Sequence, residues 1–500
     1  MQVHRLLILC LIPGCAPSDP TTLISGALLV DGTGAPARIA DVRLQSGVVL
    51  EIGDLAPERG ENVTIATGRV LAPGFIDTHS HHDRGLAEEP GALAVVSQGI
   101  TTIVVGQDGG SPIPLDAFYR DLEAAPAAVN VAAYAGHNSL RRQVMGDDFR
   151  RAASPQEVDS MATILRNTME AGALGLSTGL EYDPGIYSTT DEVIELARVA
   201  AQFDGARYIS HLRSEDRAFW DALEEIIRIG KEAGIPVQIS HMKLAMLSLW
   251  GQTGRLLARL DSARAGGVDI TADVYPYEYW QSTMTVLFPE RDFTDRAAAM
   301  FALEELAPPD GIIVSSFGPD PDYVGKTVSD IANLRGTDPV TTYMDLIAEA
   351  LAWEDSTGRG GEGIIARSMR MEDIASLYRW EHTNVSSDGS LRGRHPRGFG
   401  SFTRVLARMV RQDSVLTLEQ AVHRMTGLAA RHMGFADRGV IRVGAAADLV
   451  LFDPETVEDR ATFEEPQRPS VGIDRVWVNG VVVYDNGAVT GATPGMVIRR

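Results

Sequence analysis

Histidine and aspartate residues recur directly after short apolar runs that have the composition of buried β-strands. His79 and His81 follow the first such run, and in an extended segment their side chains share one face while His82 points the other way. Two imidazoles on one face form a clamp for a metal ion. The other ionisable residues that follow such runs are Asp108, His137, His211, His241 and Asp388.

The ligand types in this set indicate the chemistry. A single histidine at such a position more often has a structural role, held by a hydrogen bond. Several such residues gathered at the ends of neighbouring strands favour a metal site. Imidazoles and carboxylates suit zinc or a similar divalent ion, which lowers the pKa of a bound water from 15.7 to about 7. Asp388, beside Gly389 in VSSDGS, is the best candidate to accept the proton and pass it to a leaving group. The set predicts metal-assisted hydrolysis of an amide, ester or phosphoester.

An α/β fold would position these residues. Amphipathic stretches such as Asp191–Phe203 and Trp220–Ala233 alternate with the apolar runs. Eight β/α units predict a (β/α)8 TIM-like barrel, in which the residues that follow the strands meet at one rim. The expected strands are Leu71–Ile76, Thr101–Val105, Val129–Tyr134, Gly172–Ser177, Ala206–Ser210, Pro236–Ser240, Asp269–Val274 and Thr383–Ser386.

The remaining segments define the domain organisation. The β-rich residues 23–68 and 436–495 are expected to form a small β-sandwich from both chain ends, with a hairpin at Asn479-Gly480. The barrel then occupies residues 69–435. Because a structureless gap of roughly a hundred residues before the last strand is improbable, residues 288–370 are expected to be an inserted subdomain or lid. Thr417 and Gln420 predict a helix start, and Gly434 a helix end.

Composition excludes several function classes. With 45 basic and 67 acidic residues the net charge is −22, which argues against nucleic acid and anionic membranes as partners. The only cysteines are Cys10 and Cys15, so a cysteine nucleophile, a disulfide framework and a thiolate zinc site in the folded body are excluded.

The amino terminus predicts a targeting segment. One basic residue precedes an apolar run that is too short to span a bilayer, and a small residue stands before Cys15. This pattern resembles a bacterial lipoprotein signal at residues 1–14, with Cys15 lipidated and residues 15–22 as a tether. The protein would then lie on the periplasmic side of the cell envelope. The alternatives are an ordinary cleaved signal or a wrongly assigned start codon.

At this point the motifs carry a family resemblance. GFIDTHSH after a β-rich prelude, with histidines on the fifth and sixth strands and Asp388 on the eighth, resembles the amidohydrolase superfamily. Within it, the segments from about Leu23 to Asp485 are similar to N-acyl-D-amino-acid deacylases (D-aminoacylases). The segments that carry this similarity are GLSTGLEYDPGIYS, ISHLRSE, VQISHMK, ADVYPY, SSDG and HPRGFGSFTRVL.

The resemblance implies a role for each matching residue. His211 and His241 would hold one metal ion tightly, and His79, His81 and Asp388 a second, weaker one, with Asp388 also the catalytic acid/base. The implied cofactor is one or two zinc ions. The residues implied to bind the substrate's α-carboxylate are Lys243, Arg397 and either Tyr275 or Tyr277. For Tyr182 we weigh an acyl pocket against packing, and for His137 a substrate contact against a structural hydrogen bond.

Two features depart from related patterns. The deacylases have a metal-binding cysteine where this chain has Asp108, a harder ligand with which manganese or cobalt could compete better. Relatives of the hydantoinase type carry a carboxylated lysine after strand four. The only lysines here are Lys231, Lys243 and Lys326, none of them in that position, which disfavours that branch.

The expected function is hydrolysis of N-acyl-D-amino acids to a carboxylate and a free D-amino acid. One alternative keeps the class but changes the substrate, to a D-aminoacyl dipeptide or another amide. A second alternative is a non-catalytic lipoprotein that binds a ligand. The expected partner is a small-molecule substrate, with membrane contact only through the lipid anchor, and the sequence leaves the oligomeric state open.

The lipoprotein hypothesis predicts that Cys15→Ser abolishes fatty-acid attachment, because the thiol is the acceptor. Cells fed a radioactive fatty acid should label the wild-type protein and not the variant. Cys10→Ser is the matched control and should keep the label. Equal labelling of wild type and Cys15→Ser would contradict the hypothesis.

Overall fold

A closed parallel barrel is the centre of the fold in this computed structural model, which describes residues 21–500. The third strand is in two pieces, and all strands are buried, as in a barrel covered by helices. The barrel strands are β6 (Phe75–Asp77), β7 (Ile100–Val105), β8 (Asn130–Ala133) with β9 (Ala135–Gly136), β10 (Gly175–Gly179), β11 (Arg207–His211), β12 (Val237–Ile239), β13 (Ile270–Val274) and β17 (Thr383–Val385). The predicted α/β barrel is therefore confirmed.

Hydrogen bonds close the barrel between its last and first strands. The N–H of Asp388 donates to the carbonyl of His79 at 2.9 Å, and the N–H of His81 donates to the carbonyl of Gly389 at 2.8 Å. The segment after β17 thus lies against the segment after β6. This closure places His79, which follows the first barrel strand, next to Asp388, which follows the last.

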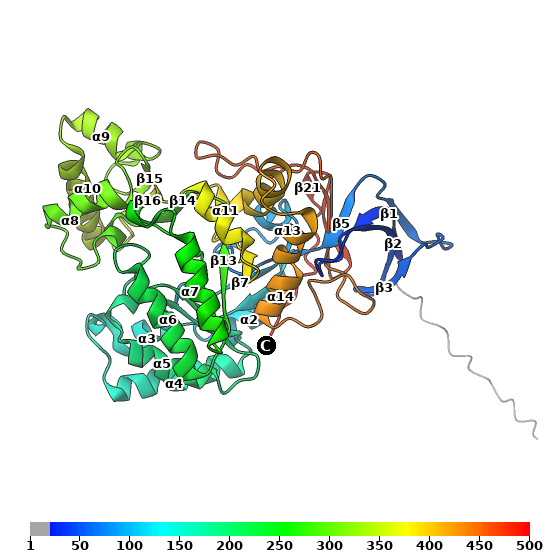
Figure 1. Ribbon diagram of the computed structural model, residues 1–500, viewed down its shortest axis with the longest axis horizontal. Helices are drawn as coiled ribbons and strands as arrows, with labels where there is room; N and C mark the ends of the chain where they lie inside the picture. The colour runs from blue at the N-terminus through cyan, green and yellow to red at the C-terminus, as the bar shows by residue number, and fades with distance from the viewer. Residues whose placement is uncertain (1–20) are drawn as a thin grey trace, which may run out of the picture.

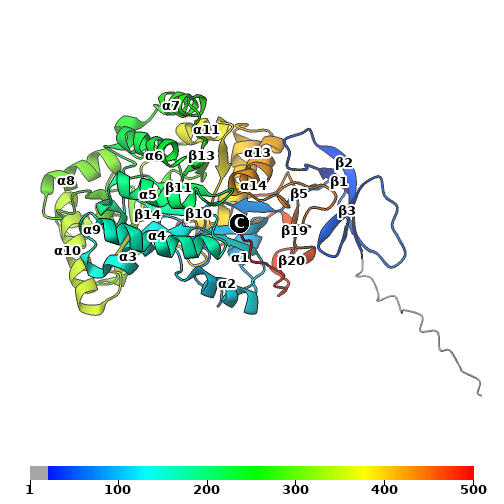
Figure 2. The same ribbon diagram turned by 90° about the horizontal axis from the view of Figure 1, so that it is seen from below.

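Helices surround the barrel (Figure 2). The expected stretches Asp191–Phe203 and Trp220–Ala233 are α5 and α6. Thr417 and Gln420 form the expected capping box at the start of α13, and Gly434 ends α14 in the left-handed conformation. The helices of the barrel and its flanks are α1 (Leu93–Val96), α2 (Leu115–Ala124), α3 (His137–Met145), α4 (Pro155–Glu170), α5 (Thr190–Ala200), α6 (Phe219–Ala233), α7 (Thr253–Ala265), α11 (Met371–Arg379), α12 (Arg397–Arg404), α13 (Leu418–Met425) and α14 (Gly427–Met433).

The first barrel strand is shorter than expected because residues 71–76 contribute to two sheets. Val70–Pro73 pairs with Leu449–Phe452 outside the barrel, and only Phe75–Asp77 belongs to the barrel. Gly74 separates the two strands, and a Cβ there would lie 2.2 Å from the side chain of Thr101. The change of sheet therefore requires a residue without a side chain.

Both chain ends form one mixed sheet, whereas a sandwich of two sheets was expected. The strand order is β21-β20-β19-β18-β5-β1-β2-β3, with β4 beside β1. Val49 at the far edge bonds the carbonyl of Ala445, so the sheet curls back around its own apolar core, which includes Leu71 and Trp477. The strands are β1 (Thr22–Leu29), β2 (Arg38–Gln45), β3 (Val48–Gly53), β4 (Asn62–Ile65), β5 (Val70–Pro73), β18 (Leu449–Phe452), β19 (Ile473–Val478), β20 (Val481–Asp485) and β21 (Ala488–Val489).

The last residues of the chain leave this sheet and join the barrel. The N–H of Val131 in β8 donates to Met496, and the N–H of Ile498 donates back to Val131. The expected boundary at residue 495 thus falls where the chain changes partner, and the C-terminus lies beside the barrel (Figure 1).

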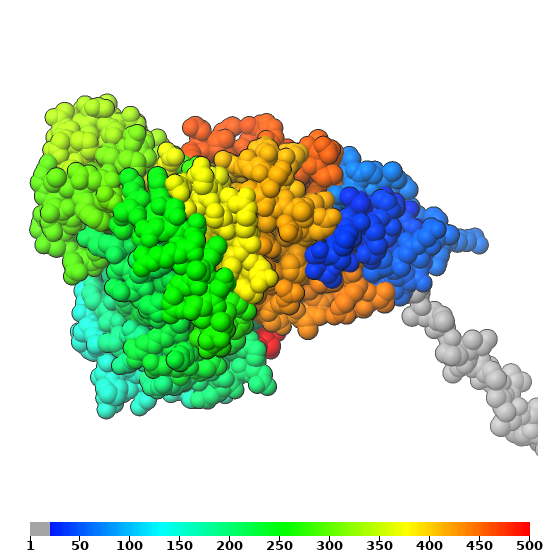
Figure 3. Space-filling model, in the orientation of Figure 1, coloured from blue at the N-terminus to red at the C-terminus, as the bar shows by residue number. Residues whose placement is uncertain are grey.

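The inserted segment before β17 is a separate lobe. It contains an antiparallel sheet in the order β14-β16-β15 and lies at the opposite end of the molecule from the N-terminal sheet (Figures 1 and 3). It begins at Tyr279, earlier than the expected residue 288, because β14 pairs only with β16, some eighty residues later. Its elements are β14 (Tyr279–Ser282), α8 (Arg296–Phe301), β15 (Ile312–Phe317), α9 (Val328–Arg335), α10 (Pro339–Thr357) and β16 (Glu362–Arg367).

Among residues 21–500 there is no helix with the length and apolar character needed to cross a bilayer. Cys10, Cys15 and the expected signal at residues 1–14 lie outside the described residues, as does most of the expected tether at residues 15–22.

Candidate active site

Ionisable side chains converge at the carboxyl-terminal rim of the barrel. The ring centroids of His79 and His241 are 4.9 Å apart, and those of His211 and His241 are 4.7 Å apart. Residues separated by more than 160 positions in the chain thus share one small volume. The converging residues are His79 and His81 after β6, Asp108 after β7, His211 at the end of β11, His241 after β12 and Asp388 after β17.

The first donor group consists of His79, His81, Asp108 and Asp388, whose ligand atoms lie within 4.8 Å of one another. Oδ2 of Asp108 is 3.3 Å from Nε2 of His79 and 3.2 Å from Nε2 of His81. Oδ1 of Asp388 is 3.6 Å and 3.4 Å from the same two nitrogens. Two imidazoles and two carboxylates therefore surround one point.

The second donor group consists of Asp108, His211 and His241. Oδ1 of Asp108 is 3.4 Å from Nε2 of His241, which is 3.0 Å from Nδ1 of His211. Asp108 therefore belongs to both groups and turns one oxygen towards each. If both groups held a cation, Asp108 would contribute an oxygen to each.

Unpartnered atoms in the cluster match a metal ion. Both ring nitrogens of His79 and Oδ1 of Asp108 are buried and have no hydrogen-bond partner among the described residues. Leaving such groups unpaired costs about 1–3 kcal/mol each. Divalent cations in the two donor groups would satisfy Nε2 of His79 and Oδ1 of Asp108, and these imidazole and carboxylate donors suit zinc, manganese or cobalt.

Three of the ligand residues have backbone conformations that aim their side chains inward. Asp108, His241 and Asp388 have φ angles of 51°, 34° and 48°, in the left-handed region that non-glycine residues rarely adopt. Each costs about 1–3 kcal/mol and persists only where neighbours hold it. For His241 the neighbour is Asp273, whose Oδ1 accepts its N–H at 2.9 Å.

Two carboxylates that the sequence analysis did not identify orient the second donor group. Oε2 of Glu181 is 2.8 Å from Nε2 of His211, and Oε1 of Glu215 is 3.1 Å from Nδ1 of His241. Each leaves the opposite ring nitrogen facing the metal position, as outer carboxylates do in metal sites. Their positions after barrel strands could have identified them in the sequence, because Glu181 comes two residues after β10 and Glu215 comes four residues after His211.

The electrostatics of the cluster favour a cation. Burial lowers the pKa of His81, but Asp108 and Asp388 outweigh it and raise that pKa to about 9. Burial and Lys243 lower the pKa of His241, yet Glu215 and Asp108 raise it to about 10. Although burial opposes ionisation of Asp388, Arg397 and the histidines hold its pKa well below the usual range. The carboxylates thus draw positive charge to these imidazoles, which a proton or a metal ion can supply.

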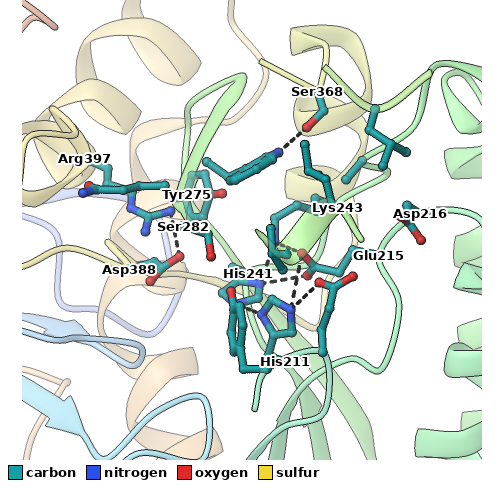
Figure 4. A pocket seen from close by; sticks show the side chains of 18 residues that line it. His211, Glu215, Asp216, His241, Lys243, Tyr275, Ser282, Ser368, Asp388 and Arg397 are labelled. Carbon is teal, nitrogen blue, oxygen red and sulfur yellow. Dashed lines mark hydrogen bonds and ion pairs between the residues drawn. The ribbon is translucent and has the colours of Figure 1, made fainter. Parts of the chain in front are cut away.

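A cavity, the first cavity, opens beside the second donor group. Tyr275, Lys243 and Arg397, which the resemblance implied as substrate-binding residues, are among the residues that line it (Figure 4). The hydroxyl of Tyr275 is buried and has no hydrogen-bond partner among residues 21–500. It is therefore available to a ligand.

The two cations of the first cavity already have anionic partners. Nζ of Lys243 bonds Glu215 at 2.5 Å and Nδ1 of His241 at 2.8 Å. Nη1 of Arg397 is 2.8 Å from Oδ2 of Asp388. Lys243 and Arg397, for which the resemblance implied binding of the substrate's α-carboxylate, therefore also neutralise carboxylates of the cluster.

A second, wider cavity lies beside the first donor group. Ser315, Ser316 and Glu362 from the inserted lobe line it together with Gln281 and Ser282. Tyr182 lines both cavities, and its ring centroid is 4.4 Å from that of His211. Tyr182 therefore packs against His211 and also lines both cavities.

Two expected substrate residues do not reach either cavity. Tyr277 points its hydroxyl towards the carbonyl of Pro396, 3.5 Å away, under the guanidinium of Arg404. His137 is fully buried, and its Nε2 is 2.9 Å from Glu192. Of the two tyrosines only Tyr275 faces the cavity, and His137 has the structural hydrogen bond. Tyr275 and Tyr277 lie two residues apart after the same strand, so the sequence does not distinguish them, and the conformation of the loop decides which one faces the cavity.

Comparison with known proteins identifies the family. The model of the amidohydrolase family matches residues 65–311 and 323–484. The chain belongs to this family.

Its relatives include an N-acyl-D-glutamate deacylase of Alcaligenes xylosoxydans xylosoxydans, 38% identical over 96% of both chains. The N-acyl-D-glutamate deacylase of Bordetella bronchiseptica, solved with zinc and a phosphonate inhibitor, is 37% identical and covers 97% of this chain and 100% of its own, with a TM-score of 0.85. A D-aminoacylase with a binuclear metal center is 33% identical, with the same coverage and TM-score. The predicted resemblance to the deacylases is confirmed.

The shared position of Asp108 predicts that Asp108→Ala disrupts both metal positions at once. Loss of outer-shell groups alone costs 10–100-fold in metal affinity, so we expect a loss of at least about 100-fold for this ligand. Elemental analysis and zinc titration of the purified protein would measure it.

Asp108→Cys is the informative second variant, since it supplies a thiolate at the same place. It should hold zinc and shift the preference away from manganese. Asp147→Ala is the control, because Asp147 is an exposed acidic residue that belongs to neither donor group. Metal content of Asp108→Ala equal to that of the control would exclude Asp108 as a ligand.

Proposed function

We propose that the protein hydrolyses the amide bond of N-acyl-D-amino acids in a metal-dependent reaction. The observation that carries this proposal is the pair of donor groups joined by Asp108 at the base of a cavity lined by Tyr275 and Arg397. Relatives with deacylase names cover nearly the whole chain at 33–38% identity.

The metal would be held by the two donor groups, and zinc is the ion we propose. The donor set fits one or two ions, with Asp108 shared if two are present. A divalent ion there polarises a carbonyl and lowers the pKa of water to about 7. The zinc and binuclear centres of the solved relatives support this assignment.

Asp388 is the proposed proton carrier. Its carboxylate faces both cavities and lies between the donor group and Arg397. Its ionised carboxylate has lone pairs with which it can accept a proton from water. Delivered to the amide nitrogen, that proton lets the amine leave, which is general acid–base catalysis by one group.

Recognition of the amino-acid half is assigned to the first cavity. The free hydroxyl of Tyr275 and the cations Arg397 and Lys243 would meet the α-carboxylate there. Since both cations are partly neutralised, the hydroxyl supplies the unshared donor. The acyl half then extends towards the second cavity.

A dipeptidase for D-aminoacyl substrates is the second candidate. The second cavity is wide and lined by serines and Glu362, which suits a polar acyl group better than acetyl. Comparing kcat/KM for N-acetyl-D-leucine and L-alanyl-D-leucine tests it. A preference for the dipeptide would favour this candidate over the deacylase.

We also propose that the protein is a lipid-anchored component of the bacterial cell envelope. The pattern before Cys15 supports this location, and the fatty-acid labelling described above tests it.

The proposed role of Asp388 predicts that Asp388→Asn lowers kcat by about 10²- to 10⁴-fold on N-acetyl-D-amino acids, the usual contribution of a general acid–base. Release of free D-amino acid would be measured with a D-amino-acid oxidase assay. Because Asp388 is also a donor, metal content is measured in parallel. Asp413→Asn, at an exposed aspartate, is the control. Metal-loaded wild type that releases no D-amino acid from a broad panel would refute the function.

A further inference from the structure

The end of the first cavity away from Arg397 has a distinct lining. This distal end includes Asp216, Ala245 and Leu306, and Val286 and Leu287 complete the apolar part of the cavity lining. These four apolar side chains line the cavity and are buried from solvent.

Contacts between loops place these residues together. The N–H of Ala245 donates to the carbonyl of Glu215 at 3.2 Å, next to Asp216. The guanidinium of Arg217 lies 4.1 Å from the ring centroid of Phe301, which brings the Asp216 loop against the segment that ends at Leu306. In Figure 4, Asp216 and Arg397 lie on opposite sides of the histidines.

The distal end carries unbalanced negative charge. The two basic side chains of the cavity lining are already paired, Lys243 with Glu215 next to Asp216, and Arg397 with Asp388 at the opposite side (Figure 4). The carboxylate of Asp216 accepts a hydrogen bond from Ser214 at 2.6 Å and has no cationic partner among the described residues. Glu181, facing His211, adds a second carboxylate nearby.

Arg291 is the nearest basic residue on the inserted segment, and it does not offset this charge. Its guanidinium bonds Asp183 and the carbonyls of Glu181, Thr285 and Phe288. It is absent from the cavity lining. Among residues 21–500, the only lysine and arginine in the cavity lining are Lys243 and Arg397, so a second carboxylate on a substrate would find no unpaired Lys or Arg in that lining.

We infer that the first cavity selects N-acyl-D-amino acids whose side chain is apolar, or apolar along its stem and cationic at its tip, over those with an acidic side chain. The inference rests on the proposed deacylase function and names its substrate class. Family membership leaves this open, because its relatives include deacylases of N-acyl-D-glutamate and a D-aminoacylase. Apolar stems suit the lining, and a terminal ammonium suits Asp216.

The wild-type enzyme tests the inference directly, with N-acetyl-D-leucine, Nα-acetyl-D-lysine and N-acetyl-D-glutamate as substrates. Because like charges in an interface are strongly unfavourable, kcat/KM for the glutamate derivative should be at least about 100-fold below that for leucine. A kcat/KM for N-acetyl-D-glutamate equal to or above that for N-acetyl-D-leucine would overturn the inference. No hydrolysis of any of the three, with metal bound, would instead count against the proposed function.

Asp216→Asn tests the residue. It should lower kcat/KM for Nα-acetyl-D-lysine about tenfold and leave kcat/KM for N-acetyl-D-leucine within about twofold of wild type. Only the lysine ammonium would interact with the carboxylate charge that the substitution removes. Asp221→Asn, at an exposed aspartate on the neighbouring helix α6, is the matched control for net charge. An unchanged ratio of lysine to leucine in Asp216→Asn would remove Asp216 from the assignment.

Discussion

Concentration of carboxylates and imidazoles in one buried volume is the constraint on which the rest of the structure depends. Buried charges are costly unless they are paired. Here Asp108 lies between two sets of imidazoles, and Arg397 and Lys243 each neutralise one further carboxylate. The buried atoms of His79 and Asp108 that still lack partners leave a place for a cation. Metal binding would thus complete the fold of the rim as well as the chemistry.

The barrel supplies the rigidity that this arrangement needs. Ligand residues follow strands that are hydrogen-bonded to their neighbours, and the bond from Asp388 to His79 joins the last strand to the first. Left-handed backbone at Asp108, His241 and Asp388 stores strain that the surrounding bonds maintain. Outer carboxylates then fix each ring, as Glu181 does for His211. A precise site is therefore built from short loops on a stiff scaffold.

The barrel and the inserted lobe both line the two cavities. The barrel provides Tyr275 and Asp388, whereas the lobe and its connecting segment provide Leu287 and Leu306 to one cavity and Ser315 to the other. The lobe has its own sheet, so the residues that it contributes lie on a different scaffold from the donor groups. Under the proposed function, this separation would let the cavity lining vary while the donor groups stay in place.

The barrel and the residues that face its rim could be predicted from the amino-acid sequence. Strand composition and the position of each ionisable residue after a strand depend on local chemistry, so His79, Asp108, His211, His241 and Asp388 could be identified directly. The partners of Lys243, the choice of Tyr275 over Tyr277, the contributions of Glu181 and Glu215, and the continuous sheet of the chain ends became apparent only in the folded protein. These features depend on distances between loops that are remote in sequence, which side-chain packing sets and local patterns do not encode.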